Sequence, residues 1–314
     1  MPALAAADAQ AVSPLYQCGW LRGMLDRVGA ILQAHTSKEG LMTSTDVKAT
    51  LLATEVRTLS AHTIPQDFRI SVALPRSYAS HPEKYYPTIY LTDATVFFGM
   101  VVDITRVMPL CGQFPETIVV GIGYPVDEPL DGALQQWEHL RTRDLIPAVE
   151  IPTELSQSYQ TGGAAEFLSF IQTELIPTIE REYRADPASR VLAGYSLGGL
   201  FALYALFHQP HLFKSYIAGS PALWYGDRVT FTYEAAYAAA QSALPVHLYL
   251  GIGEEEEQAF DGAMVSNFYQ FAARLESRKY EGLVLTRHVV ENCAHCASAA
   301  PLFQAGIQAV LSER

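Results

Sequence analysis

A serine between two glycines is the pattern in this chain with the clearest chemical potential. Ser196 stands in the segment Gly194–Gly198, which has the spacing Gly-x-Ser-x-Gly. The apolar run Val191–Ala193 precedes this segment, and an apolar pattern of helical period over Leu200–Phe207 follows it. That order predicts a strand, a sharp turn and a helix, with the serine hydroxyl projecting from the turn as a nucleophile.

The neighbours of the serine suit such a turn better than an ordinary strand–helix connection. Gly194 and Gly198 lack Cβ atoms, so strand and helix can approach closely around a strained serine. Leu197 is expected to begin the helix, where its backbone N–H has no acceptor within the helix. That N–H can stabilise an oxyanion that develops when the serine attacks a carbonyl group.

A histidine must take the proton of the serine, because a serine hydroxyl is a weak nucleophile without a base. Where this serine turn occurs, the chain order is serine, then an acid, then the histidine. The downstream candidates are His208, His211, His247, His288 and His295. The first two lie at the far end of the helix and the next two within predicted strands. Only His295 follows the carboxyl end of a strand, so we expect His295 to be the base.

The acid that orients the histidine must follow the strand that ends at Gly253. Position alone leaves Glu254, Glu255, Glu256, Glu257 and Asp261 open. Acidic residues also favour the first turn of a helix, so we expect at least three of these to be solvated residues of a helix start.

Alternating strands and helices predict how these residues are brought together. Two antiparallel strands are expected within 52–59 and 68–74, and buried strands at 87–91, 116–123, 191–194, 213–220, 245–253 and 283–290. Helices are expected at 164–183, 200–207, 231–241, 267–280 and 301–311. This alternation predicts an α/β fold with a mainly parallel sheet and helices on both faces. In such sheets, ligands bind at the carboxyl ends of the strands.

Two segments are expected to be loops near that end of the sheet. One begins at Thr92–Thr95, and the other spans 124–163 and contains Arg141, Arg143 and Asp144. A loop as long as the second is usually functional. Arg143 and Asp144 are either a solvated cluster or an arm that locks the loop or meets an anionic substrate group.

The ends of the chain and its charge limit the classes of partner. Residues 1–45 are interpreted as an extension with one amphipathic helix, packed on the main domain or on a second subunit as a homo-oligomer contact; 46–314 form the catalytic domain. The net charge of −12 argues against nucleic acid and an anionic membrane surface. No apolar run approaches a membrane span, and no secretory signal is evident, so a cytoplasmic protein is expected.

Four cysteines are too few for a disulfide scaffold in 314 residues. Cys293 and Cys296 have the spacing Cys-x-x-Cys around His295, but no second cluster of metal ligands accompanies them. We therefore expect neither a metal nor an organic cofactor, and a reversible disulfide beside His295 is an open alternative.

The chain resembles the putative esterase family that includes esterase D, the enterochelin-esterase-like hydrolases and the siderophore-trilactone esterases. The resemblance covers roughly residues 56–310. The segments that carry it are Tyr86–Asp93, Ile118–Tyr124, Arg141–Pro147, Gly194–Ala202 and Ser220–Trp224. It implies an α/β-hydrolase fold without a large lid domain, and hydrolysis of a small-molecule ester.

The resemblance also implies roles for single residues. Ser196 is the nucleophile and His295 the base; the Gly-x-x-acid pattern from Gly253 selects Glu256 as the acid, whereas Gly251 would select Glu254. Thr95 supplies the second oxyanion N–H.

The family pattern is not matched everywhere. Ala94 replaces the usual glycine, Tyr195 stands where histidine is frequent, and the two cysteines bracket the base.

Three further side chains are candidates for contact with the substrate. Tyr195, Trp224 and Arg143 are expected to line the substrate site, although each is equally consistent with core packing or a solvated arm. Acyl transfer on the same fold, as in the mycolyl transferases, is an alternative reaction. A binding protein that has lost activity is a third, which an intact Ser–acid–His set disfavours.

Overall fold

A mainly parallel sheet organises the chain. The computed structural model describes residues 50–111, 114–126, 130–148 and 158–312. Its strands are β1 (Thr54–Ser60), β2 (Asp67–Ala73), β3 (Tyr86–Leu91), β4 (Ile118–Gly123), β5 (Ala185–Tyr195), β6 (Ser215–Gly219), β7 (His247–Gly253) and β8 (Val284–Val290). They form an eight-stranded sheet in the order β1-β2-β4-β3-β5-β6-β7-β8.

The antiparallel pairings lie at one edge of the sheet. β1 pairs with β2, and β2 with β4, in antiparallel register, whereas every pair from β4 to β8 is parallel. Every residue of β4 and of β6 is buried. Burial on both faces explains their continuous apolar sequences, since helices cover both sides of a parallel sheet. The expected α/β-hydrolase architecture is therefore confirmed.

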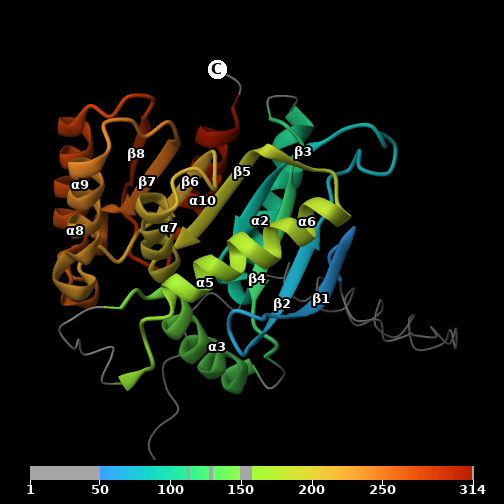
Figure 1. The fold of residues 1–314 in the computed structure, drawn as a ribbon, viewed down its shortest axis with the longest axis horizontal. Coiled ribbons are helices and arrows are strands. Elements are labelled where there is room, and N and C mark those ends of the chain that lie inside the picture. The colour runs from blue at the N-terminus through green and yellow to red at the C-terminus, as the bar shows by residue number, and fades with distance from the viewer. Residues whose placement is uncertain (1–49, 112–113, 127–129, 149–157, 313–314) are drawn as a thin grey trace, which may run out of the picture. The chain divides into compact units, whose positions relative to one another are not determined.

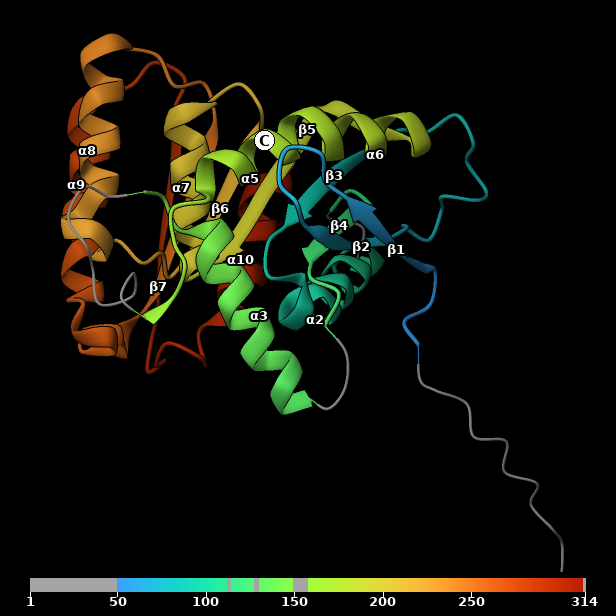
Figure 2. The same cartoon turned by 60° about the horizontal axis from the view of Figure 1, so that its bottom comes forward.

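Helices cover the two faces of this sheet unequally. They are α2 (Ala94–Val107), α3 (Leu130–Leu145), α5 (Ala164–Phe170), α6 (Ile176–Glu182), α7 (Leu197–His208), α8 (Tyr225–Ala240), α9 (Met264–Arg278) and α10 (Ala299–Leu311). Side chains of α2 and α10 form one buried cluster with the sheet, and the other helices contribute to a second cluster on the opposite face. Figure 1 shows the arrangement, and Figure 2 shows α5 and α6 on one side of β3 and β5 with α2 on the other.

Loops were expected to begin at 92–95 and to span 124–163, but the structure has a helix in each of these places. Helix α2 begins directly at Ala94, and the 16-residue helix α3 occupies Leu130–Leu145. Helix α3 was missed because it carries few apolar residues, so its helical period is weak. Figure 1 shows α3 beyond the arrowhead of β5, and Ser196 directly follows the last residue of this strand.

The expected helix over 164–183 is present but distorted. A five-residue π-helical segment, Ile171–Leu175, separates α5 from α6, and Pro177 occupies the first turn of α6. Proline has no N–H to donate to the preceding turn, so the distortion falls on the turn before it.

No large lid domain is inserted where β6 continues into α8. Residues 220–224 alone connect these two elements. Among the described residues, none of the helices is both long enough and apolar enough to cross a membrane. The amphipathic helix expected within 1–45 lies outside the described residues, and so does the oligomer contact assigned to it.

Candidate active site

Ser196 occupies a strained turn between β5 and α7. Its backbone has φ 58° and ψ −114°, a conformation that costs a residue with a side chain about 1–3 kcal/mol. A Cβ on Gly194 would lie 2.1 Å from the carbonyl oxygen of Gly198, and a Cβ on Gly198 would lie 2.4 Å from Thr92 Oγ1. Only glycine fits at either position, as the spacing Gly-x-Ser-x-Gly predicts.

Backbone hydrogen bonds hold this turn in place. The N–H of Ser196 donates to the carbonyl of Gly219 over 2.9 Å, which ties the turn to the end of β6. The carbonyl of Ser196 accepts from Leu200 at 3.0 Å and from Ala222 at 3.2 Å. Because three contacts fix the backbone, the hydroxyl has a defined direction at the carboxyl end of the sheet.

His295 lies between the serine and an acid. Its Nε2 is 3.0 Å from Ser196 Oγ, and its Nδ1 is 2.6 Å from Glu256 Oε2. A neutral imidazole with its proton on Nδ1 donates to the carboxylate and leaves Nε2 free to accept the serine proton. The structure thus brings together the three residues that the sequence and the resemblance single out. Three of the other candidate histidines bond elsewhere: His208 contacts the carbonyl of Tyr204 within α7, and His247 and His288 hydrogen bond to Thr286 and Tyr249 within the sheet.

Glu256 is fully buried and held by several donors. Its Oε1 accepts hydrogen bonds of 2.7 Å each from the N–H of Gly253 and from the hydroxyls of Ser220 and Ser298. Burial opposes ionisation, but the hydrogen bonds from His295, Ser298 and Ser220 outweigh it and hold the pKa of the Glu256 carboxyl below its ordinary value. Glu256 therefore remains an anion that can stabilise an imidazolium.

Ser220 and Ser298 were missed by the sequence reasoning. Ser220 directly follows β6 and has φ 39°, and Ser298 precedes α10, so 78 positions separate two hydroxyls that meet at the same carboxylate. Ser220 does lie in a segment that carries the family resemblance. No spacing signal in the sequence links either hydroxyl to Glu256.

Leu197 and Thr95 lie where oxyanion donors are expected. Leu197 is the first residue of α7 and Thr95 the second residue of α2, so the N–H of each belongs to the first turn of a helix. Thr95 also lies against the end of β4, because a Cβ on Gly123 would be 3.2 Å from its backbone nitrogen.

A buried ion pair anchors the residue that immediately precedes α2. Asp93 has φ 55°, a left-handed conformation, and lies two residues before Thr95. Its Oδ1 accepts from Arg141 Nε at 2.7 Å and its Oδ2 from Arg141 Nη2 at 2.8 Å. Trp137 donates to Oδ1 at 3.2 Å, and the Arg141 guanidinium lies 4.7 Å from the centre of the Trp137 ring. Helix α3 thus holds the start of α2 through a bidentate contact.

Two residues expected to contact substrate are placed differently. Tyr195 is only 4% exposed, and its hydroxyl contacts the carbonyl of His295 and lies 2.7 Å from Ser298 Oγ, so it supports His295 from within the core. Arg143 donates to both Asp144 oxygens, at 2.6 and 2.8 Å, and to Gln66. These contacts match the alternative in which Arg143 and Asp144 lock the loop. They hold the guanidinium group against other residues of the protein.

Trp224 is half-buried beside the site and contacts the exposed side chain of Phe260. The ring of Phe260 stacks at 6.3 Å from that of Trp224 and meets the His295 ring edge-on at 4.9 Å. Phe260 is not among the residues that the sequence singled out, since an isolated phenylalanine in an acidic loop carries no pattern.

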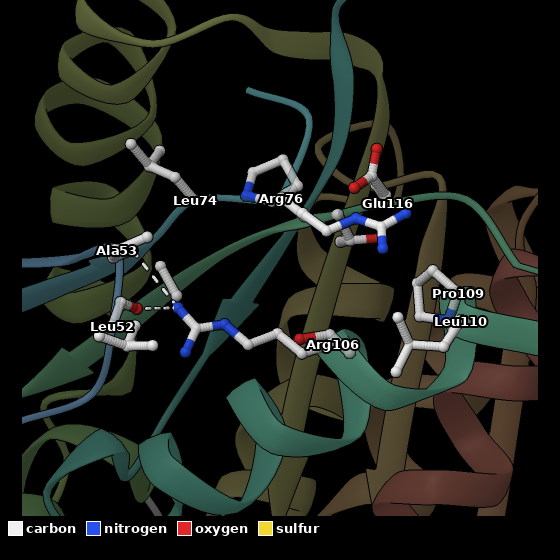
Figure 3. A pocket seen from close by; sticks show the side chains of 12 residues that line it. Leu52, Ala53, Leu74, Arg76, Arg106, Pro109, Leu110 and Glu116 are labelled. Carbon is white, nitrogen blue, oxygen red and sulfur yellow. Dashed lines mark hydrogen bonds between the residues drawn. The ribbon is translucent and has the colours of Figure 1, made fainter. Parts of the chain in front are cut away.

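One cavity borders the site and another does not. A cavity of 450 Å³ at the carboxyl end of β4 is lined by Thr95, Gly123 and Tyr124 among others. A second cavity, of 280 Å³, is lined by Leu52, Leu74 and Arg106 among others and lies at the amino end of β4, away from Ser196 (Figure 3). Among the described residues, no three His, Cys, Asp or Glu side chains are arranged to hold a metal ion, and Cys293 and Cys296 are free.

Comparison with known proteins places this geometry in a family. Residues 61–296 match the protein family described as "Putative esterase". The chain belongs to this family. It is 31% identical over 251 residues to the ferri-bacillibactin esterase BesA of Bacillus subtilis (strain 168), a match that covers 74% of this chain and 81% of BesA.

Two further similarities agree with that assignment. The siderophore enterobactin esterase of Emericella nidulans is 30% identical over 202 residues, which are 60% of this chain and 66% of that protein. The crystal structure of the BES protein from Bacillus cereus has the same fold, with a TM-score of 0.74 at 24% identity, over 87% of this chain and all of that one. The expectation of an esterase family and of a carboxylic ester hydrolase is confirmed.

Proposed function

We propose that this chain is a serine esterase in which Ser196, His295 and Glu256 act together through an acyl-enzyme. The observation that carries the proposal is the continuous contact from Glu256 Oε2 through the imidazole of His295 to Ser196 Oγ, over 2.6 and 3.0 Å. Each member also sits at the carboxyl end of a parallel strand, the end at which such sheets bind ligands.

The proposed reaction has two halves. His295 Nε2 takes the hydroxyl proton as Ser196 Oγ attacks the ester carbonyl carbon, and Glu256 stabilises the imidazolium. The N–H groups of Leu197 and Thr95 stabilise the oxyanion. His295 then gives its proton to the leaving alcohol, and water activated by the same imidazole hydrolyses the acyl-enzyme.

We also propose that the substrate is a lactone ester of a siderophore. Support comes from the relatives, which are named as esterases of ferri-bacillibactin and enterobactin. An ester of that size needs space beyond the catalytic groups, and the 450 Å³ cavity lined by Thr95 offers space for the acyl portion of the ester.

The test is hydrolysis by the purified full chain. Ferric and iron-free trilactone siderophores of the catecholate and hydroxamate classes should be compared with 4-nitrophenyl butyrate. Wild type is expected to open at least one lactone, and Ser196→Ala is expected to lose about 10⁴-fold or more in kcat on every ester that is cleaved. Unchanged turnover by Ser196→Ala would remove Ser196 from the mechanism; cleavage of the nitrophenyl ester alone would reject the siderophore assignment.

A further inference from the structure

Phe260 is an apolar side chain that the structure leaves in solvent beside the catalytic base. It is 59% exposed, although its ring contacts both His295 and Trp224. An exposed aromatic ring forgoes the free energy of burial that a core position would give it. The proposed mechanism assigns this ring no role.

The backbone around Phe260 is built to present it. Phe260 has φ 56° and Ala263 has φ 44°, left-handed conformations that are unfavourable for residues with side chains. Between them, Gly262 lies so close to Trp224 that a Cβ there would be 2.4 Å from Trp224 Cδ1. The segment 259–263 is therefore fixed against Trp224 in a strained form, which is typical of functional sites.

The order of strands places Phe260 on one side of the nucleophile. Ser196 follows β5; Thr95 and the 450 Å³ cavity lie toward β3 and β4, whereas Phe260 follows β7, on the other side. His295 protonates the leaving oxygen, so the alcohol portion of the ester must lie against the imidazole. Phe260 borders that portion, and the cavity borders the acyl portion.

We infer that Phe260 and Trp224 form a subsite for a planar aromatic group on the alcohol portion of the ester. The inference rests on the proposed function, because it assigns sides by the role of His295. A ring inserted there would stack on or meet edge-on the face that Phe260 leaves in solvent, a contact worth about 2- to 10-fold in binding.

The experiment compares two esters that differ in one ring. In 2-phenylethyl butanoate and 2-cyclohexylethyl butanoate the acyl group is the same and the ring lies two carbons from the leaving oxygen, so the chemistry of the leaving group is nearly equal. The measured quantity is the ratio of kcat/KM for the phenyl ester to that for the cyclohexyl ester. We expect Phe260→Leu to lower this ratio about 3- to 10-fold relative to wild type, and Phe260→Tyr to retain it.

Two controls make the assignment specific. Tyr85→Leu removes another exposed aromatic ring, 62% exposed, at the amino end of β3, and should leave the ratio unchanged. Ethyl phenylacetate and ethyl cyclohexylacetate carry the ring on the acyl side, and their ratio should not respond to Phe260→Leu.

Three results would overturn the inference. They are an unchanged phenyl preference in Phe260→Leu, an equal loss on both pairs of esters, or a loss confined to the acyl-side pair. Turnover by Ser196→Ala is measured alongside. If that turnover is lost, any of these three results rejects the subsite without rejecting the proposed esterase. Retained turnover in Ser196→Ala would instead reject the proposed function.

Discussion

Glu256 differs from its acidic neighbours in what surrounds it. Glu256 is fully buried and hydrogen bonded to His295, Ser220 and Ser298. Glu254 is exposed, and its described hydrogen bond comes from the backbone N–H of Asn292 at 3.0 Å. Residues with similar sequence positions thus have different surroundings. A buried carboxylate can orient and charge-stabilise an imidazole more effectively than a solvated one.

The first prediction separates these two acids. Glu256→Gln replaces the acceptor of the His295 Nδ1 proton and is expected to lower kcat at least about 100-fold, because imidazolium formation loses its counter-charge. Glu254→Gln is the matched control and should stay within about 2-fold of wild type. Steady-state kinetics on one chromogenic ester decides between them. A loss of kcat confined to Glu254→Gln would assign the acid to Glu254.

At the scale of elements, α3 reaches across to the start of α2. The Arg141 and Asp93 side chains are 7% and 0% exposed, so this ion pair is screened from water. Removing one partner of a buried pair leaves an uncompensated charge and costs about 3–5 kcal/mol. Since Asp93 precedes Thr95 by two residues, the pair also fixes the position of the proposed oxyanion donor.

The second prediction concerns this ion pair. Arg141→Met should lower the free energy of unfolding by about 3 kcal/mol and also lower kcat more than it changes KM, because the oxyanion contact acts in the transition state. Urea unfolding and steady-state kinetics measure the two effects. Arg181→Met, at an ion pair whose arginine is 65% exposed, is the control and should alter neither. A stability loss with unchanged kcat would give Arg141 a purely structural role.

The π-helical segment provides a different connection, to the β1–β2 turn. Glu174 accepts hydrogen bonds from the N–H groups of His62 and Thr63, at 2.8 and 2.9 Å. Partial burial opposes ionisation, but these hydrogen bonds prevail and lower the pKa of Glu174 to about 2. The charged form is the one that the fold stabilises.

The third prediction follows from the direction of that pKa shift. Because the folded-state pKa lies below the ordinary value of 4.5, the contribution of Glu174 is complete above pH 4.5 and is lost as the pH falls toward 2. Glu174→Gln should therefore be less stable than wild type at pH 7 by about 1–3 kcal/mol, and the difference should shrink below pH 4.5. Urea unfolding of both proteins from pH 7 to pH 3 checks this. A difference that does not depend on pH would contradict it.

At the scale of the whole molecule, the sequence predicted what is local in the chain. Strand β5, the Ser196 turn and α7 are contiguous in the chain, and His295 follows a recognisable strand. The Ser196 turn and the position of His295 can therefore be predicted from sequence patterns. Contacts between residues that are distant in the sequence are not readable in this way, because Ser220 and Ser298 meet Glu256 only after folding. The polar sequence of α3 predicts a loop rather than a helix, and the burial of Tyr195 in a supporting position is not evident from its residue type.

The fourth prediction concerns the reaction's independence from metals. In the proposed mechanism two backbone N–H groups, rather than a Lewis acid, stabilise the oxyanion. Dialysis against a chelator should therefore leave kcat/KM for a 4-nitrophenyl ester within error of the untreated enzyme. A loss that added Zn²⁺ or Mg²⁺ restores would contradict that mechanism.

In the proposed mechanism, Ser196 attacks the substrate with His295 as its base. Intact-mass and peptide mass spectrometry after reaction with a fluorophosphonate tests it most directly, because the reagent phosphonylates an activated serine. We predict one adduct, on Ser196, and a loss of esterase activity in proportion to labelling. Labelling should be absent in Ser196→Ala and slowed at least about 100-fold in His295→Ala. An adduct on another residue, or full esterase activity in fully labelled protein, would contradict the account.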